Sequence, residues 1–204
     1  MEGFAPRARE FIPTPLIETE RLLLRPLELA DAAQAQPLFA RWEIVRLLND
    51  VVPWPFPRDG VETFYREKAL PAMARGEEWH WTIRTRPHPE GLIGMISLKS
   101  EESRHASNRG FWIGLPWQGN GYATEASRAV TAFWFETLGF PTLTVPKATQ
   151  NIASRKISEH SGMRLIRTEP HGFVCGQLPA DIWQITREEW LALPGNANTG
   201  KTVD

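Results

Sequence analysis

Alternating apolar and polar residues predict strands along most of the chain, and apolar residues three or four positions apart predict the helices between them. The strand pattern occurs at 20–27, 78–85, 91–100, 108–115, 142–148, 163–169 and 181–187. The helical pattern occurs at 28–42, 61–76, 123–139 and 151–162. This order predicts a mixed α+β (α/β layered) protein with a strand–loop–helix unit at its centre.

The ends of the chain differ from this pattern. Residues 1–17 contain Pro6, Pro13 and Pro15 and are expected to form an extended leader. Residues 193–204 lack an apolar pattern and are expected to form a flexible tail. We therefore expect one domain over residues 18–192.

Composition narrows the classes of function. The chain has 204 residues, of which 42% are hydrophobic and 23% charged, as in globular domains. A formal net charge of -1 argues against general binding to nucleic acid or to an anionic membrane. No apolar run is long enough to span a bilayer. Cys175 is the single cysteine, so a disulfide framework and a four-cysteine zinc site are excluded. We expect a cytoplasmic protein without a metal site.

A loop with two glycines separates the strand pattern at 108–115 from the helix pattern at 123–139. A helix start leaves backbone N–H groups without partners, and the helix dipole adds partial positive charge there. Glycines at 119 and 121 remove side chains that would keep a phosphate away from these amides. The sequence thus predicts an anion site, although a plain tight turn has the same spacing.

A second glycine motif lies near the end of the chain. GNANTGKT at 195–202 matches the ATP-binding pattern G-x-x-x-x-G-K-[ST]. That site requires a strand before the motif and a helix after it, and only Val203 and Asp204 follow here. We therefore do not expect ATP binding.

Several linked segments together resemble one known family. Gln118, Gly121 and Ala123 fit the Q/R-x-x-G-x-G/A signature of GCN5-related N-acetyltransferases (GNAT). GFWIGLPWQGNGYATEA, NIASRKISEHSGM and ERLLLRPLELAD resemble the RimJ/RimL-like branch, in the right order over about residues 18–192. The resemblance implies the GNAT fold, a central, mostly antiparallel mixed sheet flanked by helices. It also implies that acetyl-CoA binds in the cleft between two splayed strands.

The resemblance also implies roles for individual residues. The strand with Ile113 and Leu115 pairs with the pantetheine arm through its backbone. The pyrophosphate is held by the loop residues Gln118, Gly119, Asn120, Gly121, Tyr122, Ala123 and Thr124. Asn151 lies near the pantetheine chain, although it also suits the N-cap of the following helix. Ser154 lies by the sulfur and helps to protonate the leaving thiolate, although it could equally be a capping hydroxyl.

The proton acceptor for the amine is left open. Many relatives have a glutamate just before the Gly–aromatic pair, where this chain has Arg109, preceded by Asn108. The alternative candidates are Glu101, Glu102, His80, His105 and Glu169, and each is also compatible with an ordinary surface position. Trp54 and Phe56 occupy the region that covers the acceptor site in relatives, or simply pack their proline-rich loop.

The sequence therefore predicts an acetyl-CoA-dependent N-acetyltransferase that passes acetyl directly to a primary amine. The amine belongs to a protein N-terminus, as in ribosomal-protein acetyltransferases, or to a small molecule. The protein would act as a monomer or homodimer. The alternative is a non-catalytic, regulatory acyl-CoA-binding protein on the same fold, which the missing glutamate allows.

Overall fold

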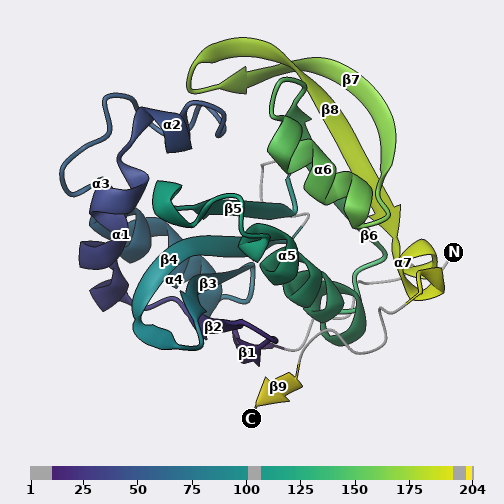
Figure 1. The fold of residues 1–204 in the computed structure, drawn as a ribbon, viewed down its shortest axis with the longest axis horizontal. Helices are drawn as coiled ribbons and strands as arrows, with labels where there is room; N and C mark the ends of the chain where they lie inside the picture. Colours follow the sequence, from purple (N-terminus) through teal and green to yellow (C-terminus); the bar gives the residue numbers. More distant parts are fainter. Residues whose placement is uncertain (1–10, 101–106, 195–200, 204) are drawn as a thin grey trace, which may run out of the picture.

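Two antiparallel sheets form the frame of the protein (Figure 1). The computed structural model describes residues 11–100, 107–194 and 201–203. The larger sheet has the order β5-β4-β3-β2-β1-β9, with β1 Leu16–Glu18, β2 Leu22–Pro26, β3 Glu78–Thr85, β4 His88–Lys99, β5 Arg109–Ile113 and β9 Lys201–Val203. The smaller sheet has the order β6-β8-β7, with β6 Thr142–Ala148, β7 Arg164–Phe173 and β8 Gly176–Thr186.

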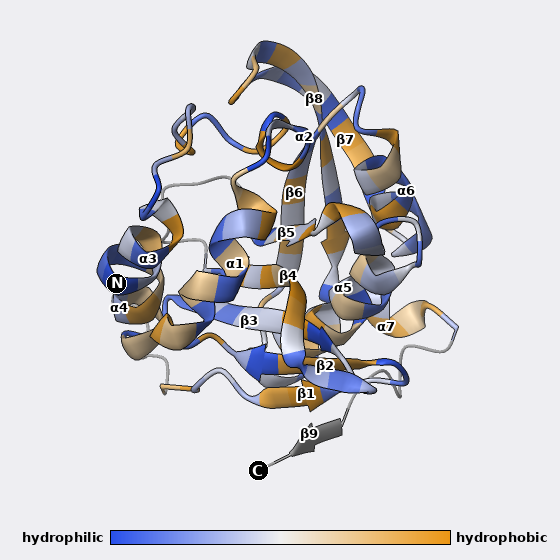
Figure 2. Ribbon diagram, turned by 60° about the vertical axis from the view of Figure 1, so that its left-hand side comes forward, coloured by the Kyte–Doolittle hydropathy of each residue, from blue (hydrophilic) through white to orange (hydrophobic). Residues whose placement is uncertain are grey.

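Helices cover both faces of the larger sheet (Figure 2). The α-helices of the described residues are α1 Ala32–Phe39, α2 Trp42–Val45, α3 Gly60–Phe64, α4 Leu70–Ala74, α5 Tyr122–Ala132, α6 Ile152–His160 and α7 Arg187–Ala192, of which α6 and α7 lie beside the smaller sheet. On one face Ala126 and Val130 of α5 pack with Trp81 of β3. On the other, Ala35 of α1 packs with Met95 of β4. None of the helices in the described part of the chain has the length and hydropathy needed to cross a bilayer.

The structure confirms the layered α+β fold and most of the predicted elements. Strands β3 and β6 have the predicted bounds of 78–85 and 142–148. The helix predicted at 28–42 is interrupted, because Ala40 leaves the helical conformation three residues after Pro37. The helices predicted at 61–76 and 123–139 each contain a π-helical turn, Tyr65–Ala69 and Phe133–Thr137.

Residues 11–17 and 201–203, near the two ends of the chain, are tied to the larger sheet. Trp79 and Trp81 donate indole N–H bonds to the carbonyls of Ile12 and Pro15, at 2.9 and 2.7 Å, and these bonds tie the leader to β3. β1 pairs with β2 on one side and with β9 on the other. The flexible tail predicted for 193–204 is thus wrong at 201–203, where a strand completes the sheet edge.

The ATP-binding pattern at 195–202 gains no structural support. Its residues 195–200 lie outside the described residues. Residues 201–203 form strand β9, whereas a phosphate-binding loop of this type needs a helix at that point.

The β7–β8 hairpin is longer than the sequence predicts, since the predicted strands cover only 163–169 and 181–187. β7 and β8 pair as far as Phe173 and Gly176, beyond Pro170 and Pro179. The hairpin tip is bonded to the segment after α2, because the amides of Val174 and Cys175 donate to the carbonyls of residues 48 and 46. Figure 1 shows the hairpin arching from α6 toward α2.

Asn108 is hydrogen-bonded to both sheets. Its backbone N–H donates to the Thr144 carbonyl, and its Oδ1 accepts from the Thr144 N–H, both at 2.8 Å. Its Nδ2 donates to the Lys99 carbonyl at 3.2 Å. Beyond this point β5 pairs with β4 and β6 pairs with β8. Asn108 therefore fixes where β5 and β6 begin to diverge.

We expect Asn108→Ala to lower the free energy of unfolding by about 1–3 kcal/mol, because the buried Thr144 N–H loses its acceptor. Urea denaturation measures this change. Asn120→Ala is the control, because the Asn120 side chain bonds only within its own exposed loop and its loss should be smaller. Equal losses in the two variants would contradict the role of Asn108 as the junction.

Candidate functional site

A cavity of about 1170 Å³ lies where β5 and β6 diverge. It exceeds the roughly 300–1,000 Å³ of a pocket for a drug-sized ligand. One side is formed by β5, the glycine loop and the starts of α5 and α6, and the other by α3 and the segment that follows α1. The cavity can therefore hold a long ligand together with a second molecule.

The glycine loop has the geometry of an anion site. Gly119 and Gly121 have φ angles of +80° and +78°, in the left-handed region that favours glycine. In the described part of the chain, the amides of Gly119, Asn120 and Gly121 make no backbone hydrogen bond, and α5 begins at Tyr122. A Cβ added at Gly119 would meet no atom within 4 Å. The loop thus presents several free N–H groups at a helix start, as phosphate recognition requires.

A clamp that the sequence did not reveal holds this loop in place. Arg21 donates from Nη1 to the Asn120 carbonyl at 3.0 Å, and its Nε forms a 2.7 Å ion pair with Glu125 of α5. The Arg21 guanidinium also lies 5.0 Å from the centre of the Tyr122 ring. Thr19 adds a 2.6 Å bond to Glu125. The clamp therefore holds the loop in shape, with the Arg21 guanidinium beside the free amides and paired with Glu125.

The other residues predicted to hold the cofactor divide into two groups. Ile113, Gln118, Tyr122, Ala123 and Thr124 line the cavity together with both loop glycines. Gln118 also fixes the end of β5, because its Nε2 donates to the Ile113 carbonyl at 2.9 Å.

Leu115 and Asn120 do not line the cavity. Leu115 begins the short 3-10 turn Leu115–Trp117. The Asn120 side chain folds back onto the carbonyls of Trp117 and Gln118.

Asn151 and Ser154 begin helix α6 at the opposite wall. Asn151 is the N-cap, and its Oδ1 accepts from the Ser154 N–H at 3.2 Å. Both residues line the cavity. The Ser154 hydroxyl is buried and has no hydrogen-bond partner within the described residues. It is therefore available to a group inside the cavity.

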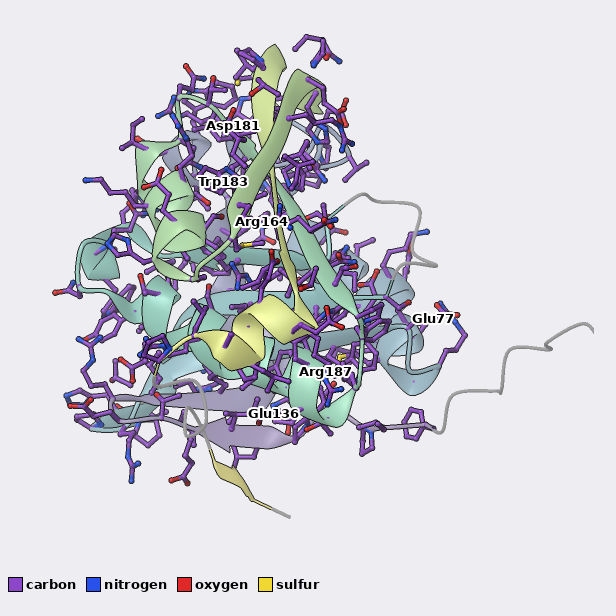
Figure 3. All side chains as sticks on the ribbon, turned by 90° about the vertical axis from the view of Figure 1, so that its right-hand side faces the viewer. Glu77, Glu136, Arg164, Asp181, Trp183 and Arg187 are labelled. Carbon is purple, nitrogen blue, oxygen red and sulfur yellow. The ribbon has the colours of Figure 1, made fainter. Side chains whose placement is uncertain are left out.

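Helix α6 is anchored from β8. Arg155, the next residue after Ser154, forms a 3.0 Å ion pair with buried Asp181, which also accepts from Thr168 at 2.7 Å. Figure 3 shows Asp181 and Trp183 along β8, with α6 beside the sheet. The smaller sheet thus fixes the position of Ser154.

Two cations lie between β5 and β6 on the side of α5. Lys147 of β6 lines the cavity, and its Nζ lies 4.8 Å from the centre of the Phe111 ring. Arg109 is fully buried and donates to Thr131 at 2.6 Å. No carboxylate pairs with either cation in the described ranges. Burial, and then the charge of Arg109, lowers the pKa of Lys147 to about 7. One sign of this pair is visible in the sequence, a lysine and an arginine at inward-facing strand positions.

The wall opposite the glycine loop is mainly aromatic and apolar. Phe56 lines the cavity, and its ring packs edge-on against Phe39, with the ring centres 5.0 Å apart. Phe39 in turn packs against Trp112 of β5. Trp54 lies outside the cavity, half-exposed beside Trp42. The structure therefore brings Phe56 to the site and leaves Trp54 at the surface.

The candidate proton acceptors differ in whether they line the cavity. His80 is buried, lines the cavity and contacts Glu78. Glu169 pairs with Arg167 on β7, away from this cavity. Glu101, Glu102 and His105 lie outside the described residues. Within the described residues, no group of three or more His, Cys, Asp or Glu side chains is arranged to hold a metal ion.

Comparison with known proteins identifies the family. A profile of the acetyltransferase (GNAT) domain matches residues 21–164. The chain belongs to this family. Among curated proteins, the FsC-acetyl coenzyme A-N(2)-transacetylase of Aspergillus fumigatus is 32% identical over 91 residues, which cover 41% of this chain. The match spans 37% of that relative's length.

Solved structures share the GNAT fold. An acetyltransferase from Bacillus anthracis has 19% identity and a TM-score of 0.70, with 85% of this chain and 99% of that chain covered. RimL, the ribosomal L7/L12 alpha-N-protein acetyltransferase, was solved with coenzyme A and has 15% identity and a TM-score of 0.69, with 87% and 98% covered. Spermidine N-acetyltransferase from Vibrio cholerae, solved with CoA and spermine, has 20% identity and a TM-score of 0.69, with 83% and 98% covered.

The departure from the GNAT pattern before the Gly–aromatic pair has a structural explanation. Asn108 joins the two sheets, and Arg109 points into the core toward Thr131. Neither side chain can accept a proton from an amine in the cavity. An amine in the cavity would therefore need a proton acceptor other than these two residues.

We expect Lys147→Met to stabilise the protein without ligand, and more strongly at low pH. Below pH 7 the folded chain must bury a charged Lys147, whereas between about pH 7 and 10 it releases this proton and the unfolded chain keeps it. The gain in melting temperature should thus be largest below pH 7 and shrink toward pH 10. Lys68→Met, at an exposed lysine, is the control. A gain in melting temperature that does not change with pH would contradict a lowered pKa for Lys147.

Proposed function

We propose that this GNAT protein is an acetyl-CoA-dependent N-acetyltransferase that acts on a primary amine. The observation that carries the proposal is that one cavity contains both the free amides at the start of α5 and the Ser154 hydroxyl at the start of α6. The thioester of acetyl-CoA supplies the acetyl group. The residues of this chain bind, orient and move protons.

The cavity fits acetyl-CoA from its phosphates to its sulfur. The amides of Gly119–Gly121, with Arg21 beside them, match the charge of a pyrophosphate. The divergence of β5 from β6 leaves backbone N–H and C=O groups without strand partners, and these suit the amides of a pantetheine arm. Asn151 and Ser154 then stand at the far end of this path. The Ser154 hydroxyl can pass a proton to the sulfur as it leaves.

The acceptor is a primary amine, of a protein N-terminus or of a small molecule. Relatives of similar fold are named for both kinds of acceptor, a ribosomal protein N-terminus and spermidine. The aromatic wall formed by Phe39, Phe56 and Trp112 suits an acceptor with an apolar part next to its amine. A panel of N-terminal peptides, amino acids and polyamines, read by release of free CoA, separates these acceptors.

The second candidate is a non-catalytic acyl-CoA-binding protein. It is favoured by one observation, the replacement of the expected glutamate by Arg109, which has a structural role. Acetyl-CoA binding without turnover of any amine in the panel would support this candidate and overturn the enzyme.

We expect Gly119→Asp to weaken acetyl-CoA binding at least about tenfold more than Gly119→Asn, a difference of about 1.4 kcal/mol. Both side chains tolerate a positive φ, and only the carboxylate repels a phosphate. Isothermal titration calorimetry measures both affinities, and melting temperatures show whether the variants are folded. Equal affinities would mean that this loop is only a turn.

We expect Ser154→Ala to lower kcat about 10²-fold while the acetyl-CoA affinity stays nearly unchanged, because the hydroxyl acts on the leaving sulfur. Steady-state kinetics with an accepted amine and a direct binding assay give the two values. Ser161→Ala is the matched control, since this serine ends the same helix and bonds to the Ile157 carbonyl. Asn151→Ala should instead weaken binding and lower stability by about 1 kcal/mol through the lost cap. Wild-type turnover in Ser154→Ala would exclude the acid role.

A further inference from the structure

A histidine–carboxylate pair lies on the face of the sheet that looks toward α3. His80 of β3 is 2% exposed, and its Nε2 lies 2.6 Å from Oε2 of Glu78. The other oxygen of Glu78 lies 3.5 Å from Nζ of Lys99 on β4. Phe64 of α3 covers the imidazole, with the ring centres 6.0 Å apart. The ring is therefore held in one orientation by a carboxylate and an aromatic side chain.

The second nitrogen of this imidazole is not used by the protein. His80 lines the cavity, and its Nδ1 has no hydrogen-bond partner among the described residues. When Nε2 donates its proton to Glu78, Nδ1 carries the lone pair. A carboxylate on one nitrogen and an open lone pair on the other is the arrangement of a general base.

The place of His80 in the sheet relates it to the reaction site. His80 pairs with Ser97 of β4, and Ser97 pairs with Gly110 of β5, so all three lie in one row on the same face. All three line the cavity. At roughly 4.8 Å per strand, the row spans about 10 Å. An amine above Gly110 is thus within reach of His80 through one water above Ser97.

We propose that His80, oriented by Glu78, is the general base that accepts a proton from the acceptor ammonium, through a water above Ser97. This inference rests on the proposed N-acetyltransferase function. Neutral nitrogen then attacks the thioester carbon, so that the C–N bond forms and the C–S bond breaks. The second nitrogen proton goes to the sulfur with the help of Ser154, and His80 releases its proton to solvent before the next turnover.

Electrostatics keep this imidazole neutral and ready to accept a proton. Burial lowers the pKa of His80, Glu78 opposes part of this effect, and Lys99 adds to it. Burial opposes ionisation of Glu78, but the hydrogen bond from His80 and the charge of Lys99 hold its pKa below the usual value. Asp59 at the start of α3, and Glu67 and Lys68 in the π-helical turn after it, are further charged residues that line this wall of the cavity. The rate should therefore fall as the pH drops through the His80 pKa, below its ordinary value.

The experiment compares His80→Gln with wild type in the full chain, using an accepted amine. We expect kcat to fall about 10²–10³-fold, acetyl-CoA affinity to change less than twofold, and the acid limb of the kcat profile to disappear. The defect should shrink with acceptors of lower amine pKa, which need less help to lose a proton. His88→Gln, at an exposed histidine, is the matched control and should leave all values unchanged.

A measurement on wild type makes the test independent of whether the variant folds. Nitrogen NMR of the histidines should show His80 neutral at pH 7, with its proton on Nε2. A charged ring, or a proton on Nδ1, would overturn the proposal. So would wild-type kcat in His80→Gln, or a fall in kcat with an unchanged pH profile. A wild-type protein that binds acetyl-CoA and acetylates no amine would overturn the enzyme function itself, and the role of His80 with it.

Discussion

The architecture depends on the point at which β5 and β6 stop being neighbours. Asn108 bonds to both sheets through its backbone and its side chain, so the two strands are joined there and diverge beyond it. Each strand then runs to a helix start that faces the same cavity, α5 after β5 and α6 after β6. The divergence of β5 and β6 thus places two helix starts around one cavity. Each helix start carries free amides and partial positive charge. The glycine loop and Ser154 occupy their places for this reason.

The backbone conformation at this centre could be predicted from the sequence because its signals are local. Gly119 and Gly121 are needed wherever the chain must take a positive φ, and Asn151 is a cap wherever a helix begins beside it. Such features depend on a few neighbouring residues. The same holds for β6, where buried Leu143 and Val145 alternate with partly exposed residues, whereas β3 is buried on both faces.

The parts that the sequence missed are set by partners far away in the chain. β1 and β9 are three-residue strands, too short for a period to appear, and they form because edges of the sheet are available. The outer part of the β7–β8 hairpin contains two prolines, which argue against a strand. It is held by contacts with residues 46–50, more than a hundred positions away. The contact between Arg21 and Glu125 is equally remote in sequence.

The His80–Glu78 pair depends partly on local sequence and partly on the fold. They are two positions apart on a strand, so alternation puts both on the face opposite Trp79 and Trp81. That much could be read from the sequence. Their hydrogen bond and the cover provided by Phe64 required the fold. The role of Asn108 could be recognised only from the structure, because a junction between two sheets leaves no local pattern in the sequence.

Strand β5 separates two environments of opposite character. Gly110 and Trp112 face the side of His80 and Glu78, where a carboxylate supports proton uptake. Arg109 and Phe111 face the other side, where buried Arg109 and partly buried Lys147 have no carboxylate partner in the described residues. Acetyl transfer to an amine needs this polarity, because positive charge leaves the nitrogen while negative charge develops on the sulfur. A cation without a counterion is costly in the ligand-free protein, and the same charge favours a nearby anion once the cavity is dry. The lowered pKa of Lys147, caused by burial and by the charge of Arg109, reflects the cost of a cation at this position.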